Sequence, residues 1–558
     1  MQLRAETYER LETDVAIIGG GLAGLNAAIA AAERGARVVV IEKGKIERSG
    51  CIAGGVDHFM AYLEEGEPWD TRDAYLAFVQ EQGRGAVDIK IQERVFCDEL
   101  FDAIKRMERI GNPLTYKDTG KFYRTRSFGA PGPYMINFDG KYLKPKLARE
   151  VRRLGCKVLD RTAATKIFVK NGRVAGVSAI NVRDGSFYFV AARAVIGSTG
   201  NTNRLFETPT GMPFNTWLCP YNNGAAQVLS YEAGAILTGM EYTRMTIVPK
   251  GFSAPGLNAL TGVGAYFVNS LGERYMERYH PLKDRAPRNV LVWAALTEIK
   301  EGRAPLFMDC RHLPEEQLNH LKTTLGLDKD TFPDYLRQKN IDIAKDLLEI
   351  MVSEGMQTGP LEVVGAGVKI DINSMSNVPG LFAAGDCADQ TKTVHLCVCG
   401  GYAAGKGAQR YAQENTADNV LDKEIIEERA RVLEPLSRPS GISYGELEDV
   451  LRKIMAENVG PARTEIGLQT AQRKLRDLKP HLADLKANDY HDLMRCLETK
   501  DLVTVGVLVT EAALYRKESR FVPYHYRLDH PKTDNENWCG QVLLQKKDGE
   551  ISKSFLPL

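Results

Sequence analysis

Six residues near the start of the chain, Gly19-Gly20-Gly21-Leu22-Ala23-Gly24, have the types and spacing of a nucleotide-phosphate loop. An apolar run precedes them, an Ala-rich segment follows, and a second apolar run stops at Glu42. In this order, the glycines let the backbone approach a pyrophosphate, and a helix N-terminus offers free N–H groups. An acid about 20 residues on accepts hydrogen bonds from a ribose. We therefore expect a dinucleotide to be bound by Gly19, Gly21, Leu22, Ala23, Gly24 and Glu42.

Two later apolar runs also end in small residues, as strands near a large cofactor do. One leads into Ser198-Thr199-Gly200 and the other into Gly385-Asp386. We expect both to fold back onto the first strand–helix–strand unit, with Thr199, Gly200 and Gly385 beside the cofactor. Asp386 would accept a hydrogen bond from a ribityl hydroxyl. Three such elements suit FAD, which is longer than NAD and needs a site along its full length.

The length of the chain and the order of its strand and helix patterns predict a fold of three parts. A chain of 558 residues is too long for one ordinary core. We expect an α/β Rossmann-type FAD-binding domain in two segments, 1–240 and 350–420, interrupted by an α+β capping domain at 241–349. A helical domain with a C-terminal tail follows at 421–558. Asn171-Gly172 between two apolar runs predicts a β-hairpin in the first segment.

The charge balance excludes some classes of partner. Lys and Arg number 73 and Asp and Glu number 72, so no overall field favours nucleic acid or an anionic membrane. No run of 18 apolar residues occurs, which argues against direct membrane insertion. The first twelve residues are polar and charged where a signal peptide would be apolar. We expect a cytoplasmic protein.

The cysteines indicate a partner rather than an internal metal centre. The chain has ten cysteines and no C-x-x-C pattern, so we predict no iron–sulfur cluster and no other metal site in it. A single flavin without a second redox centre must exchange electrons with a diffusing molecule or with a bound protein. We therefore expect a protein partner in electron transfer.

At this point the motifs resemble those of the fumarate reductase/succinate dehydrogenase flavoprotein family. The glycine loop, the two later Gly-rich strands and the tail match in order along nearly the whole chain. The tail reads Arg516-Lys517-Glu518-Ser519-Arg520, then His525-Tyr526-Arg527-Leu528-Asp529-His530-Pro531. Within the family the chain is most similar to the adenylylsulfate reductase α branch, through Ile46–Gly50, Trp217 and Gly234–Arg244. That likeness implies that the partner is a ferredoxin-like iron–sulfur subunit.

The resemblance also assigns cofactor residues beyond the glycine loop. Lys43, Ser49 and Gly50 match positions that contact FAD in the family. Respiratory members attach FAD through a His in this loop, where this chain has Gly50 or Cys51. Non-covalent FAD is therefore implied.

The catalytic candidates are Arg244, Arg288 and His395, which we expect to hold a small anionic substrate against the flavin. Arg288 matches a family arginine that donates a proton with acidic neighbours, although Asn289 follows it here. His395 comes just after the presumed flavin strand, where a loop would cross the flavin ring. The family's His and Arg clamps for fumarate are replaced by Gln357 and Cys399, which argues against fumarate.

Two other functions fit the same residues. One is an oxidase similar to L-aspartate oxidase, which hands electrons to oxygen. The other is a flavin-containing electron relay with no substrate of its own. A pocket without convergent charges would favour the relay.

Overall fold

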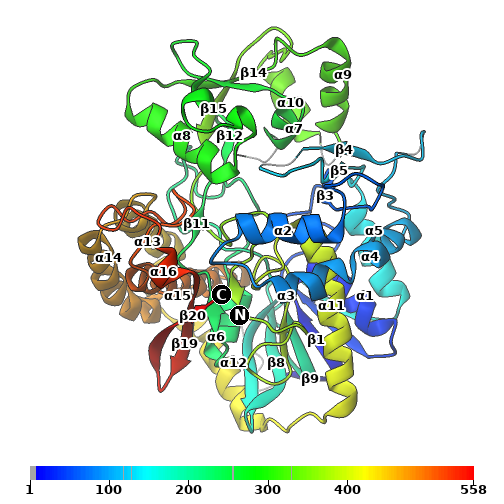
Figure 1. The fold of residues 1–558 in the computed structure, drawn as a ribbon. Coiled ribbons are helices and arrows are strands. Elements are labelled where there is room, and N and C mark those ends of the chain that lie inside the picture. The colour runs from blue at the N-terminus through cyan, green and yellow to red at the C-terminus, as the bar shows by residue number, and fades with distance from the viewer. Residues whose placement is uncertain (1–7, 117, 127–128, 254–256, 328–329) are drawn as a thin grey trace.

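Three packed parts make up the computed structural model, which describes residues 8–116, 118–126, 129–253, 257–327 and 330–558. Residues 1–7, part of the polar stretch of twelve residues in which no signal peptide is expected, lie outside the described residues. Figure 1 shows a central α/β part, a separate part above it in green and a helical part to one side in brown. The predicted fold class is confirmed.

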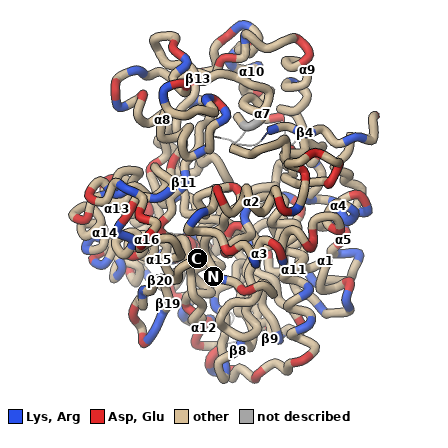
Figure 2. The backbone as a smooth tube through the Cα atoms, viewed as in Figure 1, with Lys and Arg blue, Asp and Glu red and all other residues tan. Residues whose placement is uncertain are grey.

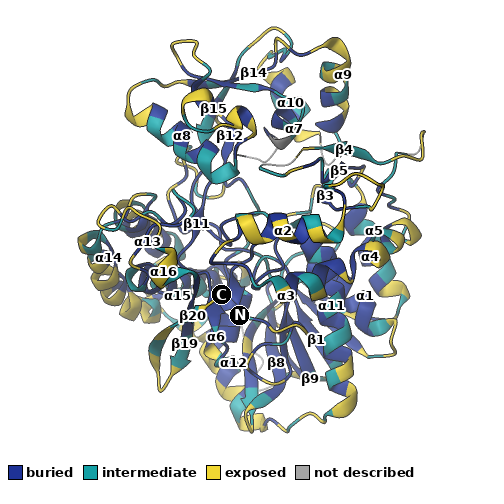
Figure 3. Cartoon of the chain, in the orientation of Figure 1, coloured by how far each residue is buried: buried dark blue, intermediate teal, exposed yellow. Residues whose placement is uncertain are grey.

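The central sheet is mostly parallel. Its strands lie in the order β6 (Lys157–Asp160), β2 (Val38–Glu42), β1 (Glu9–Ile18), β9 (Phe187–Gly197), β8 (Arg173–Asn181) and β7 (Thr162–Lys170), and β18 (Leu381–Ala383) also pairs with β9. Parallel strands covered on both faces read as continuous apolar runs. All five residues of β2 are buried, as are the last four of β1. Figure 3 shows this burial as a dark centre inside exposed outer helices.

The predicted β-hairpin is present as β7 and β8. Lys170 pairs with Arg173 at its tip. Asn171 and Gly172 have φ of 51° and 76°, the left-handed pair that a two-residue hairpin turn needs.

Helices α1 (Leu22–Ala32) and α11 (Thr393–Glu414) pack against each other beside the sheet. A Cβ at Gly401 would lie 2.4 Å from the carbonyl oxygen of Ala23, and one at Gly405 would lie 2.3 Å from that of Ala27. Only glycine allows this close approach. His395 lies in the first turn of α11 rather than on a loop, so that expectation was wrong.

The inserted part, residues 247–352, is called the cap below. Its sheet has the order β12 (Ile247–Pro249), β15 (Leu348–Val352), β14 (Leu306–Asp309), β13 (Tyr266–Val268). Four helices accompany it: α7 (Leu257–Gly262), α8 (Arg288–Lys300), α9 (Glu315–Thr324) and α10 (Thr331–Gln338). The cap has its own apolar core, and the predicted boundary at 349 falls inside β15. A two-stranded ladder, β11 (Thr243–Arg244) with β16 (Met356–Gln357), joins both of its connections to the central part.

The remaining elements surround the sheet. A small sheet has the order β3 (His58–Met60), β5 (Met135–Asn137), β4 (Tyr123–Thr125). The accompanying helices are α2 (Arg72–Gln82), α3 (Ile89–Gln92), α4 (Leu100–Arg109), α5 (Leu143–Arg153) and α6 (Ala225–Glu232). A five-residue π-helical stretch, Glu93–Cys97, lies between α3 and α4.

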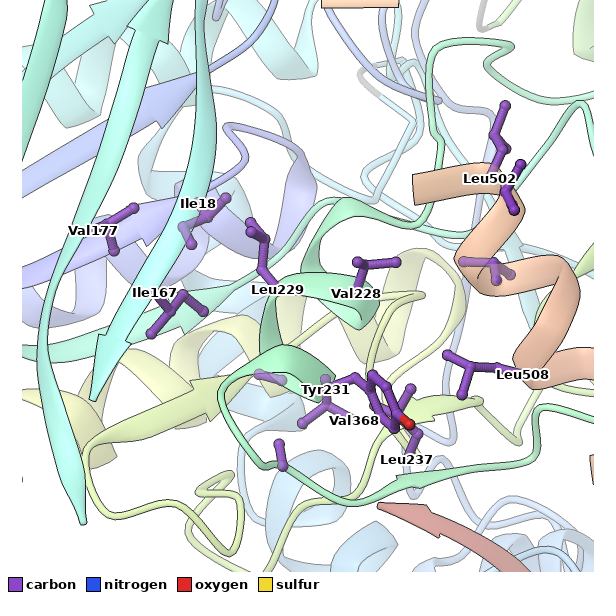
Figure 4. Packing of buried hydrophobic residues seen from close by; sticks show 14 of the residues in the cluster. Ile18, Ile167, Val177, Val228, Leu229, Tyr231, Leu237, Val368, Leu502 and Leu508 are labelled. Atoms are coloured by element: carbon purple, nitrogen blue, oxygen red, sulfur yellow. The ribbon is translucent and has the colours of Figure 1, made fainter. Parts of the chain in front are cut away.

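The C-terminal part combines helices with a hairpin. Its helices are α12 (Asp422–Ser437), α13 (Tyr444–Val459), α14 (Glu465–Leu478), α15 (Tyr490–Tyr515) and the short α16 (Asn535–Trp538). The hairpin of β19 (Gly540–Lys547) and β20 (Glu550–Pro557) extends a sheet that β10 (Leu237–Thr238) and β17 (Gly367–Val368) begin. Figure 4 shows one apolar core running from the central sheet through α6 to Leu502 and Leu508 of α15.

The surface carries charges of both signs on the cap, the central part and the helical part (Figure 2). Among the described residues, no helix combines the length and the apolar character needed to cross a bilayer.

A buried ionic network fastens α15 to the central part. The carboxylate of Glu498 accepts hydrogen bonds from Lys43 at 2.5 Å, Arg204 at 2.8 Å and Arg495 at 2.6 Å. Burial alone would raise the pKa of Glu498, but the three cations lower it to about 2. Arg204 also donates to Glu448 of α13 at 3.3 Å. The arrangement of the helical part therefore depends on a carboxylate that is almost fully buried among cations.

We predict that Arg204→Met lowers the thermal unfolding midpoint of the protein by several degrees. The substitution removes one of three cations from Glu498 and one of two from Glu448, and breaking a buried ion pair costs up to about 3–5 kcal/mol. Differential scanning calorimetry of the flavin-loaded protein measures the shift. Arg153→Met is the control, because Arg153 pairs with Glu150 at an exposed end of α5 and should leave the midpoint unchanged. Equal shifts in the two variants would contradict the prediction.

Candidate functional site

The loop between β1 and α1 is built for close backbone approach. Gly19 has φ of 101°, and a Cβ there would lie 2.5 Å from the carbonyl oxygen of Ser198. A Cβ at Gly24 would lie 1.9 Å from the carbonyl oxygen of Gly19. These two glycines are required by the protein itself, because β9 and α1 meet there without room for a side chain.

Gly21 is different, because the protein leaves space in front of it. A Cβ there would have Ser198 as its nearest described neighbour, at 3.8 Å. Gly21 is also the N-cap of α1 and offers no side-chain cap to the helix. Free N–H groups facing an open space suit a phosphate, which a side chain at this position would displace. The residues present therefore fit the pyrophosphate of a dinucleotide.

Glu42 holds the glycine loop in place. It is buried at the end of β2, and its two oxygens accept hydrogen bonds from the backbone N–H of Gly20 at 2.7 Å and of Gly44 at 2.6 Å. The contact expected between Glu42 and a ribose stays a prediction. The ammonium group of Lys43 donates hydrogen bonds to Glu498, to Asn223 and to the carbonyl of Tyr221. The Lys43 side chain therefore contributes to the interface between the central part and α15.

Three strand ends converge at the start of α1, as the sequence predicts. Gly197 at the end of β9 pairs with Ile18 on one side and with Ala383 on the other. A Cβ at Gly385 would lie 3.0 Å from the Cβ of Ala23. Segments separated by more than 350 residues of sequence thus border one space. The predicted cofactor positions at these ends are Thr199, Gly200, Gly385 and Asp386.

Local contacts fix the positions of these residues. The Thr199 hydroxyl accepts a hydrogen bond from the Ala226 N–H at 2.9 Å, which orients the start of α6. The Asp386 carboxylate accepts one from the Thr393 N–H at 3.0 Å at the start of α11.

The loop at 48–51 also reaches this space. The buried ammonium of Lys144 donates to the carbonyl and the hydroxyl of Ser49, next to Gly50. Cys51 is exposed, and its sulfur accepts a hydrogen bond from the Asn222 amide at 3.3 Å. One of the two positions where the resemblance would place a flavin-attaching histidine, Cys51, therefore carries a thiol.

Two of the three predicted catalytic residues meet on a third group that the sequence analysis missed. Arg244 on β11 donates through Nη2 to Oε1 of Glu362 at 2.5 Å. Arg288, the first residue of α8, donates through Nε to the same oxygen at 2.7 Å and through Nη1 to Thr246 at 2.6 Å. Glu362 lies between β16 and β17 in the central part, so the pair with Arg288 links that part to the cap.

The pKa shifts follow from burial and charge. Burial would raise the pKa of Glu362, but Arg244 and Arg288 hold it well below its usual range. Burial lowers the pKa of Arg288, and the charge of Arg244 adds to the effect. Burial likewise lowers the pKa of Lys392, whose ammonium donates to the carbonyls of Gly359 at 2.6 Å and Leu361 at 3.1 Å. The site thus keeps two guanidinium charges against one carboxylate.

Several buried donors at this cluster have no hydrogen-bond partner among the described residues. They include Nε of Arg244 and Nε1 of Trp217, whose ring lies 5.9 Å from the Arg244 guanidinium carbon. Nε2 of His395 is also without a partner there. Buried polar groups are nearly always hydrogen-bonded, so these atoms are available to a bound molecule.

His395 is near the cluster but cannot supply a proton as an imidazolium at neutral pH. Its Nδ1 lies 3.1 Å from the Thr393 hydroxyl, and its ring packs edge-on against Phe59 and Phe96. Burial and the nearby His58 lower its pKa to about 3. The neutral ring offers Nε2 as a hydrogen-bonding atom, and the catalytic role expected for His395 stays a prediction.

His58 on β3 has the opposite character. Its Nδ1 lies 2.6 Å from the carboxylate of Asp57. Burial would lower the pKa of His58, but the charge of Asp57 raises it. His58 lines a crevice with Asn137 of β5 and His320 of α9, between the small sheet and the cap.

Of the two site residues that the sequence analysis missed, Lys392 had a signal in the sequence and Glu362 had none. Lys392 stands three residues before His395 and could have been selected with it. No pattern marks Glu362, because its partners come from distant segments. The two positions that replace the fumarate clamps are interior. Gln357 donates to the carbonyl of Gly239 and accepts from Gln227, and Cys399 is on the buried side of α11, in an apolar core.

Comparisons with known proteins agree with this architecture. Residues 14–403 match the family model described as FAD binding domain, and residues 448–557 match fumarate reductase flavoprotein C-term. Two relatives are an uncharacterized FAD-dependent oxidoreductase of Methanocaldococcus jannaschii, 28% identical over 98% of this chain and 100% of that protein, and a fumarate reductase (CoM/CoB) subunit of Methanothermobacter marburgensis, 27% identical over 97% and 98%. Adenylylsulfate reductase of Archaeoglobus fulgidus has a similar fold, with a TM-score of 0.87 at 24% identity over 99% of this chain and 97% of that one.

We predict that Gly21→Val yields a folded protein without flavin. The valine fits the protein but fills the space in front of α1, where the pyrophosphate would bind. Flavin is measured by absorbance after acid precipitation, and in the wild type it should appear in the supernatant because no covalent bond holds it. Gly445→Val, at an open position in α13, is the control and should keep its flavin. Full flavin content in Gly21→Val would show that the loop does not hold the cofactor.

Proposed function

The chain belongs to the fumarate reductase/succinate dehydrogenase flavoprotein family, and from this premise we propose that it passes electrons between a small anionic substrate and an iron–sulfur partner subunit. It is an FAD-dependent oxidoreductase. When bound, FAD supplies two-electron redox chemistry at its ring. The residues of this chain bind the substrate, orient it and exclude water.

The convergence of Arg244 and Arg288 on one buried point carries the proposal. Two guanidinium groups from different elements, with an unpaired Nε on Arg244, form a desolvated anion site. Buried charges also hold α15 at Glu498, whose side chain is 2% exposed, whereas the carboxylate that Arg244 and Arg288 share is 24% exposed and faces the cap. The cluster therefore favours an enzyme with an anionic substrate over the relay.

The cap contributes one half of this site. Arg288 begins α8, while Arg244 lies on the ladder that connects the cap to the central part. Substrate held between them would be covered by the cap, which strengthens every electrostatic contact by removing water. His395 would donate or accept one hydrogen bond as a neutral ring.

We propose that the substrate is not fumarate. Gln357 and Cys399 face the interior of the central part and supply neither of the charged clamps that the resemblance leads us to expect for a dicarboxylate. The similarity to one subunit of a fumarate reductase supports the redox class without fixing the substrate.

The proposed electron partner is a ferredoxin-like iron–sulfur subunit. The fumarate reductase relative is by its name one subunit of a complex. All ten cysteines are unpaired thiols in the structure, which suits a reducing compartment, and we propose a cytoplasmic location.

We predict that Arg244→Gln and Arg288→Gln each lower turnover about 10- to 100-fold, because a charged hydrogen bond contributes about 1.5–3 kcal/mol. The substrate is first sought by mixing photoreduced enzyme with fumarate, adenylylsulfate and other small anions, and by following flavin reoxidation. Arg285→Gln is the control, because Arg285 is exposed three residues before Arg288. All variants should keep their flavin. Normal turnover in both site variants would refute the assignment.

We predict that the isolated chain contains no iron, whereas a complex purified from the native host contains an iron–sulfur subunit. The chain lacks the clustered cysteines that a cluster needs. Iron analysis and mass spectrometry of both preparations decide the matter. A stoichiometric cluster in the isolated chain, or a purified active protein without any iron–sulfur subunit, would contradict the proposal.

A further inference from the structure

One carboxylate oxygen is shared by the two arginines of the anion site. Arg244 reaches Oε1 of Glu362 through Nη2 and Arg288 reaches it through Nε, at 2.5 and 2.7 Å. Arginine and carboxylate groups usually pair through two parallel hydrogen bonds. Here each arginine gives Glu362 a single one, and the oxygen occupies the point where both guanidinium groups converge.

We propose that Glu362 is an internal occupant of the anion site, which an anionic substrate must displace from Arg244 and Arg288. The inference rests on the proposed function. Glu362 then determines how much negative charge a ligand must carry in order to bind at the site.

Displacement follows from the geometry. A substrate oxygen that accepts hydrogen bonds from the same two N–H groups would need the volume that Oε1 of Glu362 fills. If Glu362 stayed, two anions would lie in contact in a buried place, and like charges that close repel strongly. The side chains of Arg244 and Arg288 are only 4% and 11% exposed, so water would screen this repulsion little.

The backbone around Glu362 can stay in place while its side chain leaves. Lys392 donates to the carbonyl of Leu361 at 3.1 Å, and the Thr393 hydroxyl donates to the carbonyl of Glu362 itself at 3.1 Å. The Glu362 side chain is 24% exposed, more than either arginine. Rotation about its side-chain bonds is therefore enough, and no loop movement is needed.

If an anion displaced Glu362, it would also replace the contact between Glu362 and Arg288 that holds the cap to the central part. Glu362 belongs to the central part and Arg288 to the cap, so in the empty site this pair joins the two parts. A bound anion would take over the same role. The cap would stay closed in both states, and a substrate with a weak negative charge would fail to replace the resident carboxylate.

The experiment measures binding of malonate, a small dianion, to the oxidised flavin-loaded protein by isothermal titration calorimetry. Glu362→Gln should bind malonate about tenfold or more tightly than the wild type, because the competing charge is gone. Glu362→Ala should show the same direction. Combining Arg288→Gln with Glu362→Gln should abolish the gain. Glu349→Gln, which removes a half-buried cap carboxylate paired with Lys250, is the matched control and should bind as the wild type does.

The outcomes separate this inference from the proposed function. Malonate binding that depends on Arg288 but is unchanged or weaker in Glu362→Gln would overturn the displacement and leave the anion site standing. A loss of binding in Glu362→Gln that is larger for aspartate than for malonate would make Glu362 a ligand for an ammonium group instead, which also overturns it. No malonate binding in the wild type or in any Glu362 variant would overturn both the inference and the proposed anion site.

Discussion

Buried guanidinium groups determine how the parts of this protein sit together. Arg204, Arg463, Arg516 and Arg527 are among the largest fully buried side chains. A buried cation without a partner is strongly destabilising, so each needs an acceptor at a fixed place. Those acceptors come from other segments: Arg516 pairs with Glu241 at 2.8 Å across 275 residues of sequence. The interfaces between the central part, the cap connections and the C-terminal part are therefore specified by charge as well as by apolar packing.

The anion site follows the same rule with one difference. Where α15 meets the central part, both oxygens of Glu498 accept hydrogen bonds from three cations, and the Glu498 side chain is only 2% exposed. At the cap, two guanidinium groups face one carboxylate, and Nε of Arg244 is left without a partner among the described residues. Buried nitrogens without a partner occur in both clusters, since Nε and Nη1 of Arg204 also lack one among the described residues. What differs is access: the two arginines that we assign to substrate share one oxygen of a carboxylate that is 24% exposed.

The central sheet and the groups that we assign to substrate lie on different elements, which explains how such a fold can serve different substrates. The strand ends of β1, β9 and β18 border the space where we expect the cofactor, and backbone contacts at Gly19 and Gly197 fix them. The groups assigned to substrate lie on the two-residue strand β11, on the first residue of α8 and in the first turn of α11. Changes there need not disturb the sheet.

The sequence by itself determined the local patterns. Gly19–Gly24 between two apolar runs was sufficient for the strand, turn and helix, and Asn171-Gly172 for the hairpin, because neighbouring residues decide these elements. It also singled out Arg244 and Arg288, which the structure brings together on one carboxylate. Only the tertiary structure placed Glu362 against the two arginines and the Lys43 ammonium against Glu498. It also placed His395 in a helix, where burial lowers its pKa. Burial and pairing between distant segments decide a side chain's charge and partner, and neither can be predicted from the spacing of neighbouring residues.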